Sequence, residues 1–424
     1  MSQNKNSYSC VFPWVVWGLG ALFCFYEFLL QVSPGVMVPD LMRAFSANAT
    51  GLSYLAAAYF YAYAGMQIPV GVLLDRFGSR RLLTLACIIC AVGCVVFSMA
   101  HTLPMGIFGR TFIGFGSSFA IVGCLNLAAR WFPPQRFAFL MGLLLAVGMS
   151  GAIGGGAPLA FMVSNLGWRH SVLIFSVVGV LLAVVIWLVV RDHPPEHKQV
   201  MSQHQAPLLT GLKAVLRSRQ SWLSAIYGGL MYAPTPMICA LWGVPYLMRA
   251  YGFTRPVAAG IISIIFVGWA VGSPFFGWYS DFIGRRKPIM TIAAVVALIS
   301  IIGVIYLPNL NAPILIILFF VFGFFSGGFA VSFSLTREIN PSRYSATSLG
   351  FMNMINMFGC AVVQPVVGVI LDYFWNGSMQ DGARVYSIGA YHLALTIIPV
   401  LMFIALMLIP FIKETYCEPI DGGI

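Results

Sequence analysis

The chain has 424 residues, of which 60% are hydrophobic and only 8% are charged. Soluble domains carry about 25% charged residues, so this composition excludes an ordinary water-soluble protein and indicates that lipid is the main solvent. The formal net charge of +11 does not point to nucleic acid, because the basic residues lie in short segments between apolar runs.

Twelve apolar runs are long enough to cross a membrane, which takes about 20 helical residues. The first is too long for a cleaved signal sequence, so we expect it to remain as a membrane helix. The sequence predicts an all-α integral membrane protein of twelve transmembrane helices. The runs cover residues 12–37, 51–74, 82–100, 104–128, 138–163, 171–190, 221–247, 256–279, 288–307, 313–335, 345–371 and 388–412.

A polar stretch at 191–220 divides the runs into six and six. Within it, four leucines at 208, 209, 212 and 216 alternate with Lys213 and Arg217, which predicts a short amphipathic helix at the membrane surface. We therefore expect a first six-helix bundle in residues 1–190, a linker in 191–220 and a second bundle in 221–424.

The distribution of Lys and Arg predicts the orientation. If the N-terminus lies inside, 17 of these residues fall in inner segments, five in outer segments and Arg110 within a helix, which accounts for all 23. Basic residues are enriched in cytoplasmic loops, so we expect both termini in the cytoplasm.

The two halves share a loop motif. Its first copy runs from Gly71 through Asp75 to Arg81, and its second runs from Gly277 through Asp281 to Lys287, 206 residues later. Such self-similarity predicts two parallel repeats with a binding site between them at mid-depth.

With this doubled motif, the chain resembles the major facilitator superfamily over nearly its whole length. More narrowly, the strings at 13–23, 30–34, 59–63, 67–71 and 131–134 resemble the intraphagosomal nutrient transporters of intracellular proteobacteria. The resemblance implies a pseudo-symmetric pair of bundles, a monomer in the bacterial inner membrane, and import of amino acids or, in some members, nucleosides.

The loop motif also predicts latches on the cytoplasmic side. Asp75 and Asp281 can bind nearby arginines or helix N-termini and hold that side shut. The alternative is that these arginines only set orientation. The expected gating residues are Gly71, Asp75, Arg76, Arg80, Arg130, Arg136, Gly277, Asp281, Arg285 and Arg343, with Arg337 as a further partner for Asp281.

Two charged residues lie within membrane runs. Glu27 is near the middle of the first run, and burial there disfavours its charged form, which makes it a candidate proton carrier. Arg110 in the fourth run matches a family arginine and could organise coupling or bind a carboxylate. The alternatives are a permanently paired Glu27 and an Arg110 that reaches toward the outer surface. His392 and Asp372 are weaker candidates, and for Asp372 we expect a solvated outer position.

Polar and aromatic side chains recur at helical spacing and predict the lining of a substrate cavity, although such stripes also serve as packing between helices. These groups suit a small zwitterion or nucleoside better than a polyanion. The candidates are Gln31, Tyr59, Tyr63, Gln67, Tyr227, Tyr232, Trp242, Asn353, Asn356 and Gln364.

Enzyme and pump chemistry find no support in the sequence. It has no phosphate-binding loop, nucleotide fingerprint or metal-ligand pattern, and we interpret Cys87, Cys90 and Cys94 as packing residues. We expect no cofactor and a proton gradient as the energy source. The remaining alternatives are export or uptake of another small molecule, such as a siderophore, and a nutrient sensor that moves nothing.

Overall fold

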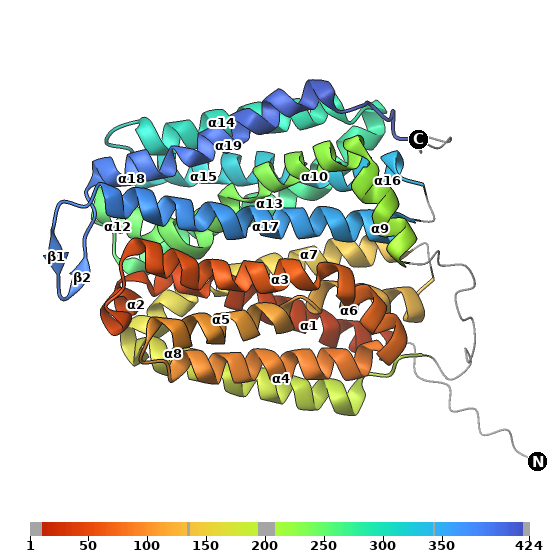
Figure 1. The fold of residues 1–424 in the computed structure, drawn as a ribbon, viewed down its shortest axis with the longest axis horizontal. Helices are drawn as coiled ribbons and strands as arrows, with labels where there is room; N and C mark the ends of the chain where they lie inside the picture. Colours follow the sequence, from red (N-terminus) through yellow and green to blue (C-terminus); the bar gives the residue numbers. More distant parts are fainter. Residues whose placement is uncertain (1–10, 134–135, 194–207, 342–343, 419–424) are drawn as a thin grey trace, which may run out of the picture.

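The computed structural model describes residues 11–133, 136–193, 208–341 and 344–418. Nearly all of them are helical, and the helices run along the long axis of the molecule (Figure 1). The first half of the chain, red to yellow, forms one bundle, and the second half, green to blue, forms another beside it. We call the end where α1 begins and α19 ends the base, and the opposite end, which carries α2 and the β1–β2 hairpin, the hairpin end.

The first bundle contains eight α-helices, and one of them turns back on itself. Within α8, Gly167 has a φ of 77°, a left-handed value that favours glycine, and the chain reverses there. The elements are α1 (Phe12–Val32), η1 (Ser33–Val36), α2 (Val38–Phe45), α3 (Ala49–Phe77), α4 (Ser79–Ser98), α5 (Leu103–Ser117), α6 (Ala120–Trp131), α7 (Phe137–Gly154) and α8 (Ala157–Val189).

The second bundle begins with the expected short helix, α9 (Leu208–Arg217), which packs against the start of α17 through Gly211 and Tyr344. The others are α10 (Arg219–Tyr232), α11 (Pro234–Met237), η3 (Ile238–Trp242), α12 (Gly243–Tyr251), α13 (Arg255–Ile283), α14 (Lys287–Tyr306), α15 (Ala312–Ser326), η4 (Gly327–Ala330), α16 (Val331–Ile339), α17 (Ser345–Tyr373), β1 (Met379–Gln380), β2 (Ala383–Arg384), α18 (Ile388–Leu395), α19 (Ile397–Leu408) and η6 (Ile409–Phe411).

The helices cross the membrane region twelve times, as the sequence predicts. Within the described ranges, ten helical stretches are long and apolar enough to cross a membrane. The stretch 139–189 reverses at Gly167 and so supplies two of the crossings. The remaining crossing is the seventh predicted run, which forms α10, α11, η3 and α12 instead of one helix. Pro234 and Pro236 break it, because proline lacks the N–H of a helical hydrogen bond.

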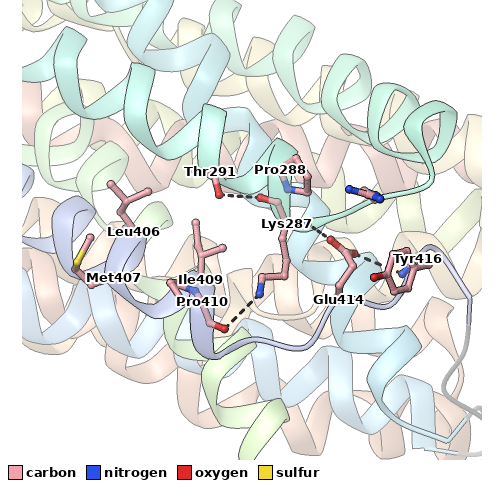
Figure 2. A pocket seen from close by; sticks show the side chains of 10 residues that line it. Lys287, Pro288, Thr291, Leu406, Met407, Ile409, Pro410, Glu414 and Tyr416 are labelled. Carbon is pink, nitrogen blue, oxygen red and sulfur yellow. Dashed lines mark hydrogen bonds between the residues drawn. The ribbon is translucent and has the colours of Figure 1, made fainter.

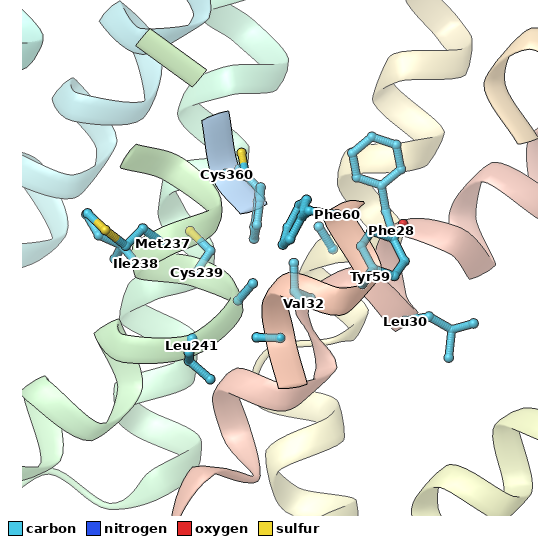
Figure 3. Close-up of a cluster of buried hydrophobic side chains, with 14 of the residues drawn as sticks. Phe28, Leu30, Val32, Tyr59, Phe60, Met237, Ile238, Cys239, Leu241 and Cys360 are labelled. Atoms are coloured by element: carbon cyan, nitrogen blue, oxygen red, sulfur yellow. The ribbon is translucent and has the colours of Figure 1, made fainter. Parts of the chain in front are cut away.

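The bundles meet along α3 and α17 on one side and along α7, α8 and α13 on the other. Their shared core lies at mid-depth, where apolar side chains of both halves come together (Figure 3). Lipid-facing side chains are apolar as well, so association of the helices depends on close packing. The labelled members of this core are Phe28, Leu30, Val32, Tyr59 and Phe60 from the first half, and Met237, Ile238, Cys239, Leu241 and Cys360 from the second.

Candidate functional site

Glu27 lies in the middle of the first bundle and is bound to a tyrosine. The Tyr59 hydroxyl donates to Oε1 of Glu27 at 2.6 Å, and Glu27 is only 1% exposed. Its second oxygen, Oε2, has no hydrogen-bond partner among the described residues. The carboxyl group therefore has one fixed partner and one oxygen available to bind a proton.

Arg110 is equally buried, but its guanidinium group binds backbone carbonyls and does not form an ion pair with Glu27. Its Nη1 donates to the carbonyl of Leu30 at 2.8 Å and its Nη2 to that of Gln31 at 3.5 Å. Its guanidinium carbon lies 4.9 Å from the centre of the Tyr59 ring. Arg110 thus fixes the last turn of α1 and contacts Glu27 only through Tyr59. It does not reach toward the outer surface.

Small residues bring these side chains together. A Cβ on Gly114 would come within 2.2 Å of the carbonyl oxygen of Tyr59, and a Cβ on Gly151 within 2.1 Å of that of Phe25. Because glycine has no Cβ, α5 packs directly on α3, and α7 on α1. Glu27, Tyr59 and Arg110 meet where these helices touch.

A small cavity lies between the halves, beside Gln31. Its volume is about 20 Å³, enough for one water molecule but not for a small organic molecule, so the halves are closed around it. Gln31 Nε2 and the Tyr232 hydroxyl lie 3.5 Å apart across it. The lining residues are Phe28, Gln31, Val32, Met149, Tyr232, Thr235, Pro236, Phe266 and Trp269.

A second polar contact joins the halves nearer the base. Asn353 Nδ2 donates to Oε1 of Gln67 at 2.7 Å. The predicted stripes of α3 and α17 therefore face each other at this point, and the Gln67 Nε2 has no partner among the described residues.

The other predicted lining residues are more dispersed. Tyr63 is buried beside Tyr59, with ring centres 5.9 Å apart. Asn356 and Gln364 are buried on α17, and no described residue bonds their side-chain amides. Tyr227 donates to the carbonyl of Met290 within the second bundle, which is a packing position away from the cavity.

Trp242 is fully buried on η3, outside the set that lines the cavity. The prediction also missed Trp269, whose ring lies 5.8 Å from that of Tyr232 and whose Nε1 has no described partner. The residues around Trp269 in α13 are apolar from Ile264 to Gly272, so nothing in the pattern distinguishes this tryptophan from a packing residue.

The hairpin end is closed by a polar cluster centred on Asp372, at the end of α17. This carboxylate accepts from the backbone N–H groups of Ala49 and Thr50, at 3.2 and 2.8 Å, and from the Thr50 hydroxyl at 2.6 Å. It also accepts from Tyr386 at 2.7 Å and Arg384 at 3.3 Å. Asp372 thus lies at the hairpin end, but it is not solvated as we expected, because it is bonded to the opposite half and its side chain is only 14% exposed.

A second ion pair lies at the same end. Arg255 Nη1 is 2.7 Å from Oδ2 of Asp40, which joins α13 to α2. His392 also lies there, with Nε2 3.4 Å from the Tyr246 hydroxyl. Of the polar contacts between halves that the structure describes, those of Asp372 and Asp40 fall at the hairpin end, and the Asn353–Gln67 contact lies nearer the base.

At the base, the second-half motif forms a network within its own bundle. Arg286 binds Asp281 at 2.5 Å and Glu338 at 2.5 and 3.2 Å. Burial opposes ionisation of Arg286, but the hydrogen bonds to Glu338 and Asp281 outweigh it and raise the pKa of Arg286 above its ordinary value. The described partner of Asp281 is Arg286 rather than Arg337, and Arg343 lies outside the described residues.

The segment after η6 completes this network. Glu414 accepts from the backbone N–H groups of Arg286 and Lys287 at 2.8 and 2.9 Å, which satisfies the start of α14. Thr415 donates to Glu338 at 2.5 Å.

The first-half motif repeats one part of this arrangement, the carboxylate that accepts from the start of the next helix. Asp192, which follows α8, accepts from the backbone N–H of Arg80 at 2.9 Å, as Glu414 does from Arg286. The Arg80 side chain donates to the carbonyl of Trp187, and Arg130 lies 3.1 Å from His193. Arg76, Arg136 and Arg285 are exposed, and the side chain of Asp75 lies outside the described part of the chain.

Glycines at the interface show where the halves touch. A Cβ on Gly368 would come within 2.5 Å of Ser53, and a Cβ on Gly156 within 2.0 Å of Ser263, both toward the hairpin end. In contrast, a Cβ on Gly71, Gly142 or Gly277, toward the base, would meet nothing within 4 Å. The halves are therefore in tight contact toward the hairpin end, whereas these three glycines toward the base face open space.

Comparison with known proteins agrees with this architecture. The family model described as Major Facilitator Superfamily matches residues 17–243 and 236–416. A relative named "Uncharacterized transporter YybO", from Bacillus subtilis (strain 168), is 23% identical and the match covers 88% of this chain and 90% of the relative. Another, named "Probable galactarate/D-glucarate transporter GudP", from Escherichia coli (strain K12), is 24% identical over 90% of each chain.

Among solved structures, a bacterial homolog of the human lysosomal transporter Spinster, in an inward-facing and unoccupied conformation, has a TM-score of 0.77. The two share 15% sequence identity, and the match covers 95% of this chain and 97% of that one.

Proposed function

The chain belongs to the Major Facilitator Superfamily, a family of transporters and not of enzymes, and from this we propose that it imports a small polar nutrient. The proposed substrate is an amino acid or a similar molecule, and we propose that import occurs by alternating access coupled to protons. In this mechanism the two bundles rock about a central site that opens to each side in turn. The observation that carries the proposal is the buried Glu27–Tyr59–Arg110 group beside the polar contacts between the halves.

The separation of the halves supports alternating access. Contacts at Asp372, Asp40 and Gly368 hold the hairpin end together, whereas Gly142 and Gly277 face open space at the base. We infer that the described state is shut toward the outside and parted toward the cytoplasm, with both termini cytoplasmic. A second state would reverse these contacts.

The chemistry of the mid-depth residues favours an uncharged or zwitterionic substrate. Amide groups and a phenol can donate and accept hydrogen bonds around a small molecule, and an indole N–H can donate one. Pro234 and Pro236 also deprive the carbonyl oxygens of Leu230 and Tyr232 of their usual helical donors, which provides acceptors for an ammonium group.

The alternative is a small organic anion, because GudP is named for two sugar diacids. Arg110 is the one arginine within the described mid-depth region, and two carbonyl oxygens already hold it. A dicarboxylate would need further cations, so the electrostatics favour the nutrient of lower charge. Nucleosides and siderophores fit the same hydrogen-bonding groups and remain alternatives, as do export and a sensing role without transport.

Glu27 supports the choice of protons as the coupling ion. A neutral carboxyl group is far cheaper to bury than a carboxylate, so protonation and deprotonation of Glu27 change the electrostatics of the site substantially. Tyr59 links this change to Arg110 and hence to the end of α1, which contributes Gln31 to the cavity. The setting we propose is the bacterial inner membrane, with the protein working as a monomer.

Transport by the purified protein in proteoliposomes tests the function. The liposomes are preloaded with one unlabelled candidate, and entry of a trace of the same labelled compound is followed. We expect counterflow with at least one amino acid and none with galactarate. Counterflow with galactarate but with no amino acid would favour the anion transporter, and ligand-dependent thermal stabilisation without any counterflow would favour a sensor.

A further inference from the structure

A groove at the base, remote from the mid-depth site, has the properties of a lipid-binding site. It lies between the start of α14 and the end of α19 with η6 (Figure 2). Its volume is about 540 Å³. Lys287 and Thr291 of α14 line one side, and Pro410, Glu414 and Tyr416 line the other.

The polar part of the groove carries two cations. Arg285 is exposed, with its guanidinium carbon 5.9 Å from the centre of the Tyr416 ring. Lys287 Nζ donates one hydrogen bond, to the carbonyl of Pro410 at 3.3 Å, and an ammonium group has three donors. Both side chains can therefore bind a further acceptor.

The one carboxylate in the groove is already satisfied. Both oxygens of Glu414 accept from backbone N–H groups at the start of α14, where the helix dipole also favours a negative charge. An incoming anion would therefore depend on the two cationic side chains and not on the helix terminus.

The rest of the groove is apolar and opens toward lipid. Leu406 and Met407 line its deeper part, and Met407 is 48% exposed. Next to Thr291, Ile292 is 49% exposed on the outer face of α14. The groove thus changes from cationic at the base to apolar toward mid-membrane, which matches the order of headgroup and acyl chain in one leaflet.

The first half has no equivalent pair of cations. In the repeated motif, Ser79 stands where the second half has Arg285, and Ser79 is fully buried. The cationic groove is therefore a property of one half and not a by-product of the repeat.

We propose that this groove binds an anionic phospholipid of the surrounding leaflet, with its phosphate held by Arg285 and Lys287 and an acyl chain along Leu406 and Met407. The occupant is a lipid and not a free phosphate, because half of the lining residues are apolar and one of them, Met407, is 48% exposed. Such a lipid bridges α14 and the segment after η6, which also carries Glu414 and Thr415 of the Arg286 network.

Binding of dioctanoyl phosphatidylglycerol to the full-length purified protein tests this inference. The lipid is titrated in detergent and followed by native mass spectrometry and thermal stabilisation. Each juxtamembrane cation contributes about fivefold to binding of an anionic surface, so the double variant Arg285→Gln/Lys287→Gln should bind on the order of 25-fold more weakly. The matched control, Arg337→Gln, removes an exposed arginine at the base outside the groove and should bind normally.

Two further arms separate the lipid from other ligands and from misfolding. Thr291→Trp fills the groove without changing its charge and should weaken binding of phosphatidylglycerol too. Inorganic phosphate alone should not stabilise the protein, and phosphatidylcholine should bind more weakly than phosphatidylglycerol. Unchanged binding by the double variant, or equal stabilisation by inorganic phosphate, would overturn the proposal.

Discussion

Glu27 is the residue on which the coupling mechanism depends. Its replacement by glutamine keeps the shape and the hydrogen bond from Tyr59 but removes the exchangeable proton. Glu27→Gln should therefore abolish accumulation driven by a pH gradient or membrane potential while substrate exchange persists. One proton moving down 100 mV supports about fifty-fold accumulation of a neutral substrate, so the loss is easily measured in proteoliposomes.

The control for this experiment is Tyr59→Phe, which keeps the carboxyl group and removes its hydrogen bond. Accumulation by this variant should be reduced but should not disappear. If Glu27→Gln accumulates substrate as well as the wild type does, Glu27 has a structural role only.

Asp372 is expected to hold the hairpin end shut. Asp372→Asn removes the charge that strengthens its hydrogen bonds to Ala49, Thr50 and Tyr386. The loss of about 2 kcal/mol shifts a two-state equilibrium by about thirtyfold. Spin labels at Met99 and Leu307, which are exposed near the hairpin end of opposite halves, should then report a larger population of long distances.

An aspartate outside the cluster provides the comparison. Asp381 is exposed on the hairpin between β1 and β2, and Asp381→Asn should leave the distance distribution unchanged. An equal shift in both variants would mean that total charge, and not the cluster, controls this end.

At the scale of helices, α7 and α13 are placed to meet when the base closes. Gly156 of the α7–α8 junction contacts Ser263 of α13 toward the hairpin end, and the two helices are antiparallel. Gly142 lies fourteen residues before Gly156, and Gly277 lies fourteen residues after Ser263, so Gly142 and Gly277 are at the same level. Both glycines face open space in the described state. We infer that they come into contact in the opposite state.

Substitution by residues of increasing size tests this contact. Leucine at position 142 or 277 should leave folding stability within about 0.5 kcal/mol of the wild type, because its side chain enters open space. It should nevertheless slow net transport severely by preventing closure of the base, and alanine should have a much smaller effect. Equal rates for alanine and leucine would show that the two helices do not approach each other.

The sequence could predict elements that depend on local composition. Hydropathy located the runs, and Pro234 and Pro236 marked the one that breaks into shorter helices. The stripe of Tyr59, Tyr63 and Gln67 was visible because helical spacing puts these residues on one face, and all three are buried.

Contacts between distant segments could not be predicted in this way. Asp372 bonds to Thr50, 322 residues away, and no local pattern connects the two. Glu414 likewise binds Arg286, 128 residues away, although the matching role of Asp192 in the first half makes this pairing part of the repeat. The loop motif drew attention to Asp281, but the choice of Arg286 over Arg337 depends on how the loop folds.

For the whole molecule, the orientation in the membrane is the main prediction. Cysteines introduced at Asn376 and Ala250 should react with an impermeant maleimide added outside intact cells, whereas those at Arg81 and Arg337 should react only after permeabilisation. The background should be low, because seven of the eight described native cysteines are buried. Reaction of the second pair in intact cells would invert the orientation.

The segment after η6 has a consequence for the order in which the protein is assembled. Among the described residues, it is the last to leave the ribosome, yet Glu414 and Thr415 satisfy groups at the start of α14 and on α16 that were synthesised long before. During synthesis, the N–H groups of Arg286 and Lys287 lack their acceptor Glu414, and Glu338 lacks its donor Thr415, until this segment has been made. The second bundle therefore acquires its finished base only after translation passes residue 415, which makes a nascent chain stalled before this point distinguishable, by proteolysis, from a released one.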